Sequence, residues 1–326
     1  MTENPRVLSK KDFSSDQEVR WCPGCGDYAI LAAVQSFLPE LGRTPDDIVF
    51  VSGIGCSSRF PYYLSTYGLH SIHGRAPAIA TGLSVTRPDL DVWVVTGDGD
   101  ALSIGGNHLI HALRRNVDMT ILLFNNRIYG LTKGQYSPTS EPGKITKSTP
   151  AGSVDRPFNP VSLALGAEAT FVARTIDSDR GHLIDVLRAA AEHEGTALVE
   201  IYQNCNIFND GAFDLVKNPQ SRDEALIRLV AGEPITFGDR RVVRDADGHL
   251  QVADAGEPVV HDPTDLELAF ALSRLSGSEL DHTPIGIFRQ VSEPTYDAGV
   301  QQQVDDSATE ADLRALLTGP DPWAVS

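Results

Sequence analysis

The sequence predicts an α/β domain, with a mostly parallel sheet covered by helices on both faces, followed by an irregular C-terminal extension. Three observations support this fold class. Short, continuously apolar strands alternate with helical stretches through residues 27–201, which is typical of strands buried on both faces. The length of 326 residues suits two domains, or one large domain with an appendage. Residues 206–326 carry 22 acidic and 9 basic side chains and hold most of the net charge of -17, which indicates a change in structural role.

The elements of the domain are predicted from hydrophobic periodicity. Helices are expected where apolar residues recur three and four positions apart, and strands where β-branched and aliphatic residues run without interruption. The predicted strands span residues 48–51, 91–96, 119–124, 171–173 and 197–201. The predicted helices span residues 27–41, 102–115, 160–166 and 182–194.

The remaining chain reads as an acidic extension that packs on the domain or on a partner subunit. We therefore divide the chain into residues 1–205 and 206–326. The extension shows helical spacing at 225–230, 266–275 and 311–317, and a turn-rich stretch at 234–252 in which DADG favours a hairpin turn. No separate core is evident in it.

Composition excludes several classes of function. A net charge of -17 argues against non-specific binding to nucleic acid or to an anionic membrane. The longest apolar stretches are far shorter than a membrane-spanning helix. The polar N-terminus lacks the apolar core of a signal peptide. We therefore expect a cytoplasmic protein.

The four cysteines are too few for a disulfide scaffold. Cys22 and Cys25 form a CxxC motif in WCPGCG, while Cys56 lies in GIGCSS and Cys205 in YQNCN. Their spacing leaves several interpretations open: isolated buried thiols, a redox pair, or a four-thiolate metal site such as structural zinc. A metal site would have to be assembled by the fold from distant loops.

A second pattern lies at the ends of two predicted strands. The strand 91–96 runs into Gly97, Asp98 and Gly99, and 28 residues after Asp98 the next strand is followed by Asn126. One crossover therefore brings a carboxylate and an amide oxygen to the same sheet edge. These oxygens suit a Mg²⁺ that also binds a diphosphate, and a helix that begins near Asp100 would favour the phosphate.

The motifs together resemble one family. WCPGCG, GIGCSSRFP, HGRAPAIATG, GDGDALSIGGNH and NNRIYGLTKGQYSPTS look like the β subunit of 2-oxoacid:ferredoxin oxidoreductases, and most like the 2-oxoglutarate type. The resemblance is dense from about residue 18 to residue 210 and weaker through ITFGDRR and TPIGIFRQVSEPTYD. It implies a thiamine-diphosphate-binding fold.

The resemblance also implies a set of site residues. Cys22, Cys25, Cys56 and Cys205 would ligate one 4Fe-4S cluster, and Asp98, Asn126 and the carbonyl of Ile128 would hold Mg²⁺. Gly97 and Gly99 would line the diphosphate, while Ile54, Gly55 and Ser57 would lie between cluster and cofactor. The further cofactor-binding candidates are His73, Gly74, Arg75, Asp100, Gly130 and Leu131.

Three residues are candidates for contact with the substrate. His73 would hydrogen-bond the phosphate or the charge that develops on the substrate carbonyl oxygen. Arg59 and Lys133 would bind the distal carboxylate that distinguishes 2-oxoglutarate from pyruvate. For each of them an ordinary structural or surface role is the alternative.

The activity implied is the oxidative decarboxylation of 2-oxoglutarate with coenzyme A to succinyl-CoA and CO₂, with electrons passing through the 4Fe-4S cluster to ferredoxin. The same chemistry on pyruvate, branched-chain or aryl 2-oxoacids is an alternative, and a zinc-stabilised scaffold subunit is a non-enzymatic one. The chain offers no glutamate-bearing pyrimidine domain to activate thiamine diphosphate. In this family that domain belongs to the α subunit, so we expect a complex of two α and two β subunits.

Overall fold

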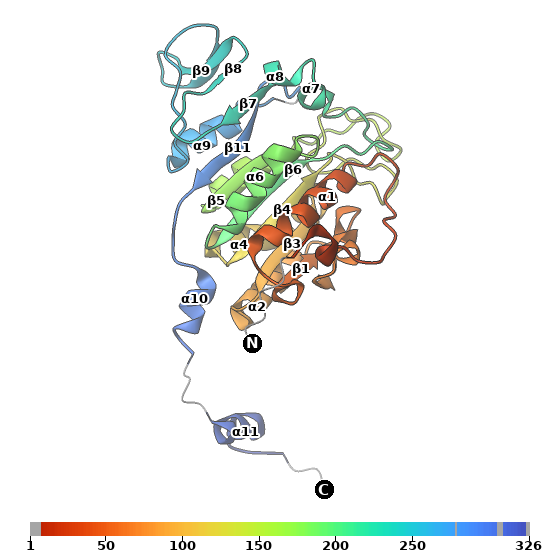
Figure 1. Ribbon diagram of the computed structural model, residues 1–326, viewed down its shortest axis with the longest axis vertical. Helices are drawn as coiled ribbons and strands as arrows, with labels where there is room; N and C mark the ends of the chain where they lie inside the picture. Colours follow the sequence, from red (N-terminus) through yellow and green to blue (C-terminus); the bar gives the residue numbers. More distant parts are fainter. Residues whose placement is uncertain (1–7, 278, 305–308, 324–326) are drawn as a thin grey trace.

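An eight-stranded sheet forms the centre of the computed structural model, which describes residues 8–277, 279–304 and 309–323. The strand order is β2–β1–β3–β4–β6–β5–β11–β7 (Figure 1). Neighbouring strands are parallel, except that β11 runs antiparallel to β5. The strands are β1 Ile48–Ser52, β2 Tyr67–His70, β3 Asp91–Gly97, β4 Met119–Asn125, β5 Phe171–Ile176, β6 Thr196–Tyr202, β7 Leu226–Leu229 and β11 Thr283–Gln290. The predicted mostly parallel sheet is confirmed.

Helices cover both faces of this sheet. The α-helices are α1 Asp27–Phe37, α2 Ala76–Thr86, α3 Asp98–Leu102, α4 Gly106–Arg115, α5 Pro160–Gly166, α6 Arg180–Ala191, α7 Asp214–Lys217, α8 Arg222–Ala225, α9 Leu266–Ser273, α10 Tyr296–Gln301 and α11 Glu310–Thr318. The 3₁₀ helices are η1 Lys10–Phe13, η2 Leu38–Leu41, η3 Pro45–Asp47 and η4 Ser57–Tyr63. Helices α2, α4, α5 and α9 pack on one face, and α1 and α6 pack on the other.

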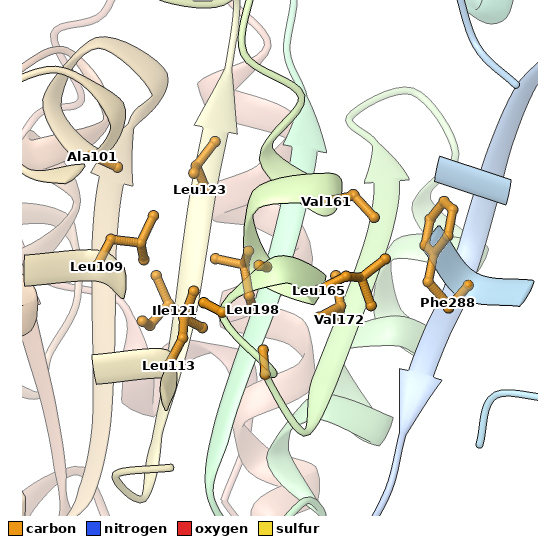
Figure 2. Close-up of a cluster of buried hydrophobic side chains, with 14 of the residues drawn as sticks. Ala101, Leu109, Leu113, Ile121, Leu123, Val161, Leu165, Val172, Leu198 and Phe288 are labelled. Carbon is orange, nitrogen blue, oxygen red and sulfur yellow. The ribbon is translucent and has the colours of Figure 1, made fainter. Parts of the chain in front are cut away.

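The core is built by alternation along the buried strands. In β4, Ile121 and Leu123 face the helices α4 and α5, whereas Leu122 and Phe124 face the opposite layer. Figure 2 shows the first of these layers, where strand and helix side chains interlock beneath α4 and α5. Because successive strand residues point to opposite faces, a strand buried on both sides must be apolar throughout. This is the reason that the strands could be predicted from uninterrupted apolar runs.

Two predicted elements differ from the structure. The helix expected at 102–115 begins only at Gly106, as α4, because the chain turns at Ser103–Gly105 after the separate short helix α3. A side chain at Gly105 would collide with the Asp100 carbonyl oxygen at 2.4 Å. The helix expected at 225–230 is wrong: Leu226–Leu229 is strand β7, which pairs with β11 and buries Ile227 and Leu229 in the core.

The chain after residue 205 supplies two strands of the central sheet. Strand β11 pairs with β5, and β7 pairs with β11. Strands β8 (Thr236–Phe237), β9 (Arg240–Arg244) and β10 (Leu250–Ala253) form a separate antiparallel sheet, and the hairpin predicted at DADG joins β9 to β10. Helices α9 and α11 confirm the helical spacing at 266–275 and 311–317. Helix α11 buries none of its residues and lies apart from the domain in Figure 1. Among the described residues, no helix has both the length and the apolar character needed to cross a membrane.

Candidate cofactor and cysteine site

Four adjacent strands deliver most of the candidate residues to one edge of the sheet. The loops that follow β1, β3, β4 and β6 all lie at the carboxyl ends of parallel neighbours, where ligands bind in open α/β sheets. A cavity of about 330 Å³ opens there. The predicted residues that line it are Ile54, Gly55, Cys56, Ser57, His73, Gly97, Asp98, Gly99, Asp100, Asn126, Ile128, Gly130 and Leu131. The sequence reasoning missed Asp27, Phe124, Tyr129, Thr132 and Gln203, which line it as well.

Asp98 is one of the buried carboxylates that line the cavity. It is the first residue of α3, directly after β3, and it is only 2% exposed. Its Oδ2 accepts hydrogen bonds from Ser137 Oγ at 2.5 Å and from Thr139 Oγ1 at 2.6 Å. Burial raises the pKa of Asp98 to about 6, although these hydroxyls act in the opposite direction. The carboxyl group is therefore mostly ionised at neutral pH.

A tight turn after β4 holds the side-chain oxygen of Asn126, the second candidate metal ligand. Asn126 Oδ1 accepts a hydrogen bond from the backbone nitrogen of Ile128 at 3.1 Å. Tyr129 then reaches across the cavity and donates its hydroxyl to the carbonyl of Gly99 at 2.9 Å. A Cβ at Gly99 would lie 2.1 Å from the Tyr129 ring, so the second glycine of GDG is required by this contact. This contact could not be predicted from the sequence, because Gly99 lies in α3 and Tyr129 lies in the segment after β4.

Asp100 holds the His73 loop in place. Its Oδ1 accepts hydrogen bonds from His73 Nδ1 at 2.6 Å and from the backbone nitrogen of Gly74 at 2.7 Å, and its Oδ2 accepts one from Thr96 Oγ1 at 2.7 Å. Both oxygens are thus engaged by protein, and the His73 imidazole lines the cavity. Arg75 donates to the carbonyl of His73 at 3.0 Å and does not line the cavity.

The four cysteines converge beside the cavity. Cys22 and Cys25 precede α1, Cys56 precedes η4, and Cys205 follows β6. All four are free thiols. Burial raises the pKa of Cys25 and raises that of Cys56 to about 12, and the neighbouring cysteines raise both further. The thiols of Cys25 and Cys56 therefore stay neutral unless a cation binds them.

Polar side chains lie next to these thiols and contact them or their backbone. Gln203 Nε2 donates to Cys25 Sγ at 3.2 Å, and Trp21 Nε1 donates to the carbonyl of Cys56 at 2.7 Å. Asp27 is fully buried between the thiols and the cavity, and burial raises its pKa to about 7. A Cβ at Gly130 would lie 3.4 Å from Cys56 Sγ, so the turn that lines the cofactor cavity also touches the cysteine site.

Two predicted cations lie outside the cavity lining. Arg59 is half-buried beside Cys56, where its charge favours the thiolate, and it donates to the carbonyl of Arg20 at 3.3 Å. Lys133 is exposed and follows Leu131 and Thr132, which do line the cavity. Lys133 is therefore at the rim of the cavity, in a left-handed conformation with φ of 66°.

Comparison with known proteins agrees with this geometry. Residues 53–201 match the family model described as the C-terminal TPP binding domain of thiamine pyrophosphate enzymes. The 2-oxoglutarate oxidoreductase subunit KorB of Mycobacterium tuberculosis is 65% identical over 97% of this chain and 88% of that protein. The 2-oxoacid:ferredoxin oxidoreductase subunit beta of Saccharolobus solfataricus is 39% identical over 83% of this chain and 81% of that protein. The chain belongs to the 2-oxoacid:ferredoxin oxidoreductase β-subunit family.

A solved structure extends the likeness to the whole fold of this family. The 2-oxoglutarate:ferredoxin oxidoreductase from Magnetococcus marinus, with 2-oxoglutarate, coenzyme A and succinyl-CoA bound, has a TM-score of 0.78 and 36% identity. The match covers 96% of this chain and 97% of that one. The likeness therefore extends beyond residues 53–201 to nearly the whole chain. The predicted family and fold are confirmed.

Proposed function

We propose that this β subunit takes part in the oxidative decarboxylation of 2-oxoglutarate, with coenzyme A as acyl acceptor and ferredoxin as electron acceptor. The observation that supports this most directly is the shared wall between the two sites. Cys56 and Gly130 border both the cofactor cavity and the cysteine site, so electrons have a short path between them. When bound, thiamine diphosphate supplies the electron sink for decarboxylation, and an iron-sulfur cluster supplies one-electron transfer.

Asp98, Asn126 and the carbonyl of Ile128 are assigned to Mg²⁺. The donor set is composed of oxygens, as this ion requires. Ser137 and Thr139 both bond Oδ2 of Asp98, so they fix the rotamer of the carboxylate and leave Oδ1 for the metal. Gly97 adds no side chain to the cavity, which leaves room for a diphosphate there.

Cys22, Cys25, Cys56 and Cys205 are assigned to a 4Fe-4S cluster. Thiolates are the ligands that such clusters require. Among the described residues, no three cysteine sulfurs lie within 4.8 Å of one another. Sulfurs that surround one zinc ion at about 2.3 Å lie only about 3.8 Å apart. The wider spacing favours the larger cluster over structural zinc.

His73 and two cations are assigned to the substrate. Asp100 fixes the Nδ1 side of the His73 ring, which leaves Nε2 free to hydrogen-bond a phosphate or carbonyl oxygen. Arg59 and Lys133 are proposed to select the distal carboxylate of 2-oxoglutarate from the edge of the site. Replacing each by glutamine should raise KM for 2-oxoglutarate and leave KM for pyruvate within about twofold.

The partner of this chain is the large subunit that completes the thiamine diphosphate site, and both named relatives are themselves subunits. The test is coexpression of the two subunits, followed by viologen reduction with 2-oxoglutarate, pyruvate, a branched-chain oxoacid and phenylpyruvate. A preference for 2-oxoglutarate supports the proposal. A preference for another oxoacid would assign the chain to a sibling enzyme, and the absence of any reduction would leave the scaffold alternative.

The cluster assignment is tested separately. Iron and sulfide should be found in anaerobically purified complex at about four of each per chain, with an electron paramagnetic resonance signal that appears on reduction. Zinc in place of iron would contradict the assignment.

A further inference from the structure

A second cavity, of about 300 Å³, lies beside the cofactor cavity. Asn125 and Thr139 form part of its wall, and Thr139 also bonds Asp98 in the first cavity. The two cavities are therefore separated by this hydrogen-bonded layer. None of the residue assignments made for the proposed function lies at the second cavity.

Four guanidinium groups line the second cavity. Arg174 belongs to β5, Arg127 follows β4, Arg156 precedes α5, and Arg274 follows α9. These segments are far apart in the sequence, and the fold brings their arginines together. Like charges in one cavity repel each other, and they are unexpected in a chain with a net charge of -17.

The floor of the cavity is buried, hydrogen-bonded and electrically balanced. Arg174 is 1% exposed and donates Nε to Glu200 Oε2 at 2.6 Å, while Glu200 Oε1 accepts a hydrogen bond from Asn125 Nδ2 at 2.7 Å. The Arg174 guanidinium lies between the rings of Tyr202 and Phe288, 5.2 and 5.3 Å from their centroids. Both oxygens of Glu200 are therefore used in holding Arg174 and Asn125, and Glu200 cannot neutralise a second arginine.

The mouth of the cavity carries surplus positive charge. The side chains of Arg156 and Arg274 are exposed, and within the described parts of the chain neither has a hydrogen-bond or ion-pair partner. The other carboxylate of the lining, Glu141, is already paired with Lys144 at 2.8 Å. The positive charges of Arg156 and Arg274 therefore have no counter-charge within the described parts of this chain, and an anion from outside the chain would neutralise them.

We propose that this cavity binds a ligand that carries a phosphoryl group. The planar fork of arginine suits a phosphate, which offers acceptors to several guanidinium groups at once. A volume of about 300 Å³ leaves room for an organic part beside the phosphate. The phosphoryl group belongs either to a free phosphate ester or to coenzyme A, the second of which rests on the proposed function, and both sources use the same recognition chemistry.

The test is calorimetric titration of the assembled enzyme with inorganic phosphate. The enzyme is first saturated with thiamine diphosphate and Mg²⁺, so that phosphate cannot enter the cofactor cavity. Wild type should show saturable binding of one phosphate per β subunit. The double variant Arg156→Gln/Arg274→Gln should weaken it about tenfold or more, since it removes two charge-assisted donors. Arg114→Gln, on the exposed side of α4, is the matched control and should bind like wild type.

Two results would overturn the proposal: no saturable binding to the wild-type complex, or equal binding by wild type and the double variant. Because the titration uses the assembled complex, it also tests whether a carboxylate of the partner subunit occupies the cavity. If it does, phosphate will fail to bind. A second titration in the presence of coenzyme A distinguishes the sources. Displacement of phosphate assigns the site to coenzyme A, and undiminished binding assigns it to a free phosphate ester.

Discussion

Replacing Thr139 by valine removes one hydroxyl from beside Asp98 and preserves the shape of the side chain. Thr139 is 4% exposed, and its Oγ1 lies 2.6 Å from Asp98 Oδ2 and 2.9 Å from Asn125 Oδ1. Asp98 retains the hydrogen bond from Ser137. Asn125 Oδ1 retains the backbone nitrogen of Arg127 as a donor at 3.1 Å. The variant therefore tests one hydrogen bond to the proposed metal ligand.

The size of the expected loss in Mg²⁺ affinity follows from the competition between a proton and the metal ion at Asp98. A hydrogen bond to a charged group contributes about 1.5–3 kcal/mol, and about 1.4 kcal/mol corresponds to a factor of ten. Burial already raises the pKa of Asp98 to about 6, so loss of a donor raises it further, and Mg²⁺ must then displace a proton at neutral pH. We expect the apparent Mg²⁺ dissociation constant at pH 7 to rise by a factor of about 2 to 15.

The assay is titration of metal-free complex with Mg²⁺ in the presence of thiamine diphosphate, followed by protein fluorescence, at pH 7 and at pH 9. The Mg²⁺ affinities of wild type and Thr139→Val should become equal at the higher pH, where the carboxyl group of Asp98 is ionised in both proteins. Thr139→Ser should bind like wild type because it restores the hydroxyl. Thr86→Val, which loses only bonds within α2, is the surface control. Equal affinities at pH 7, or a deficit that persists unchanged at pH 9, would refute the reasoning.

Three further predictions concern the site and the fold. Cys205→Ser should lower the iron content of the anaerobic complex at least about twofold, measured by iron quantitation, and full iron occupancy would show that Cys205 is not a ligand. Gly99→Ala should weaken thiamine diphosphate binding about tenfold or more, because the new Cβ would lie 2.1 Å from the Tyr129 ring; Gly106→Ala, with nothing within 4 Å, is its control, and equal affinities would argue against the contact. Burial lowers the pKa of His182 to about 4. The stability linked to this group is therefore fully present at pH values above the ordinary histidine pKa, and it is lost as the pH falls toward 4. Lowering the pH from 7 to 5 should cost about 2 kcal/mol of unfolding free energy through this group, and His182→Asn should show a correspondingly shallower decline in urea denaturation.

The elements that were predicted well are those whose burial is complete. Strands β3 and β4 and helix α5 carry their signal in their own residues, since apolar side chains must fill both layers. Strand β2 was missed because all four of its residues are exposed at the sheet edge. Strand β7 was read as a helix because ALIRLV follows acidic helix formers, and only its pairing with β11 makes it a strand.

The residues of the candidate site also fall into two groups, those that a sequence motif indicates and those that only the fold brings together. Asp98, Asn126 and the cysteines could be found because each lies in a short motif with fixed spacing. The roles of Asp100 and Thr139 could not be read from the chain, because their partners are 27 and 41 residues away and on other loops. The four arginines of the second cavity likewise share no sequence pattern. Contacts of this kind exist only after the strands have been placed side by side.

The position of β11 has a consequence for the synthesis of the protein. During translation, β5 emerges well before β11, and until β11 arrives the outer edge of β5 exposes unpaired backbone groups. The thiamine-diphosphate-binding domain therefore cannot close its own sheet while it is being made. A ribosome that stalls between β6 and β11 would release a chain whose β5 edge is unpaired, and this edge would tend to pair with other chains. Early contact with a chaperone or with the partner subunit would protect this edge in the cell.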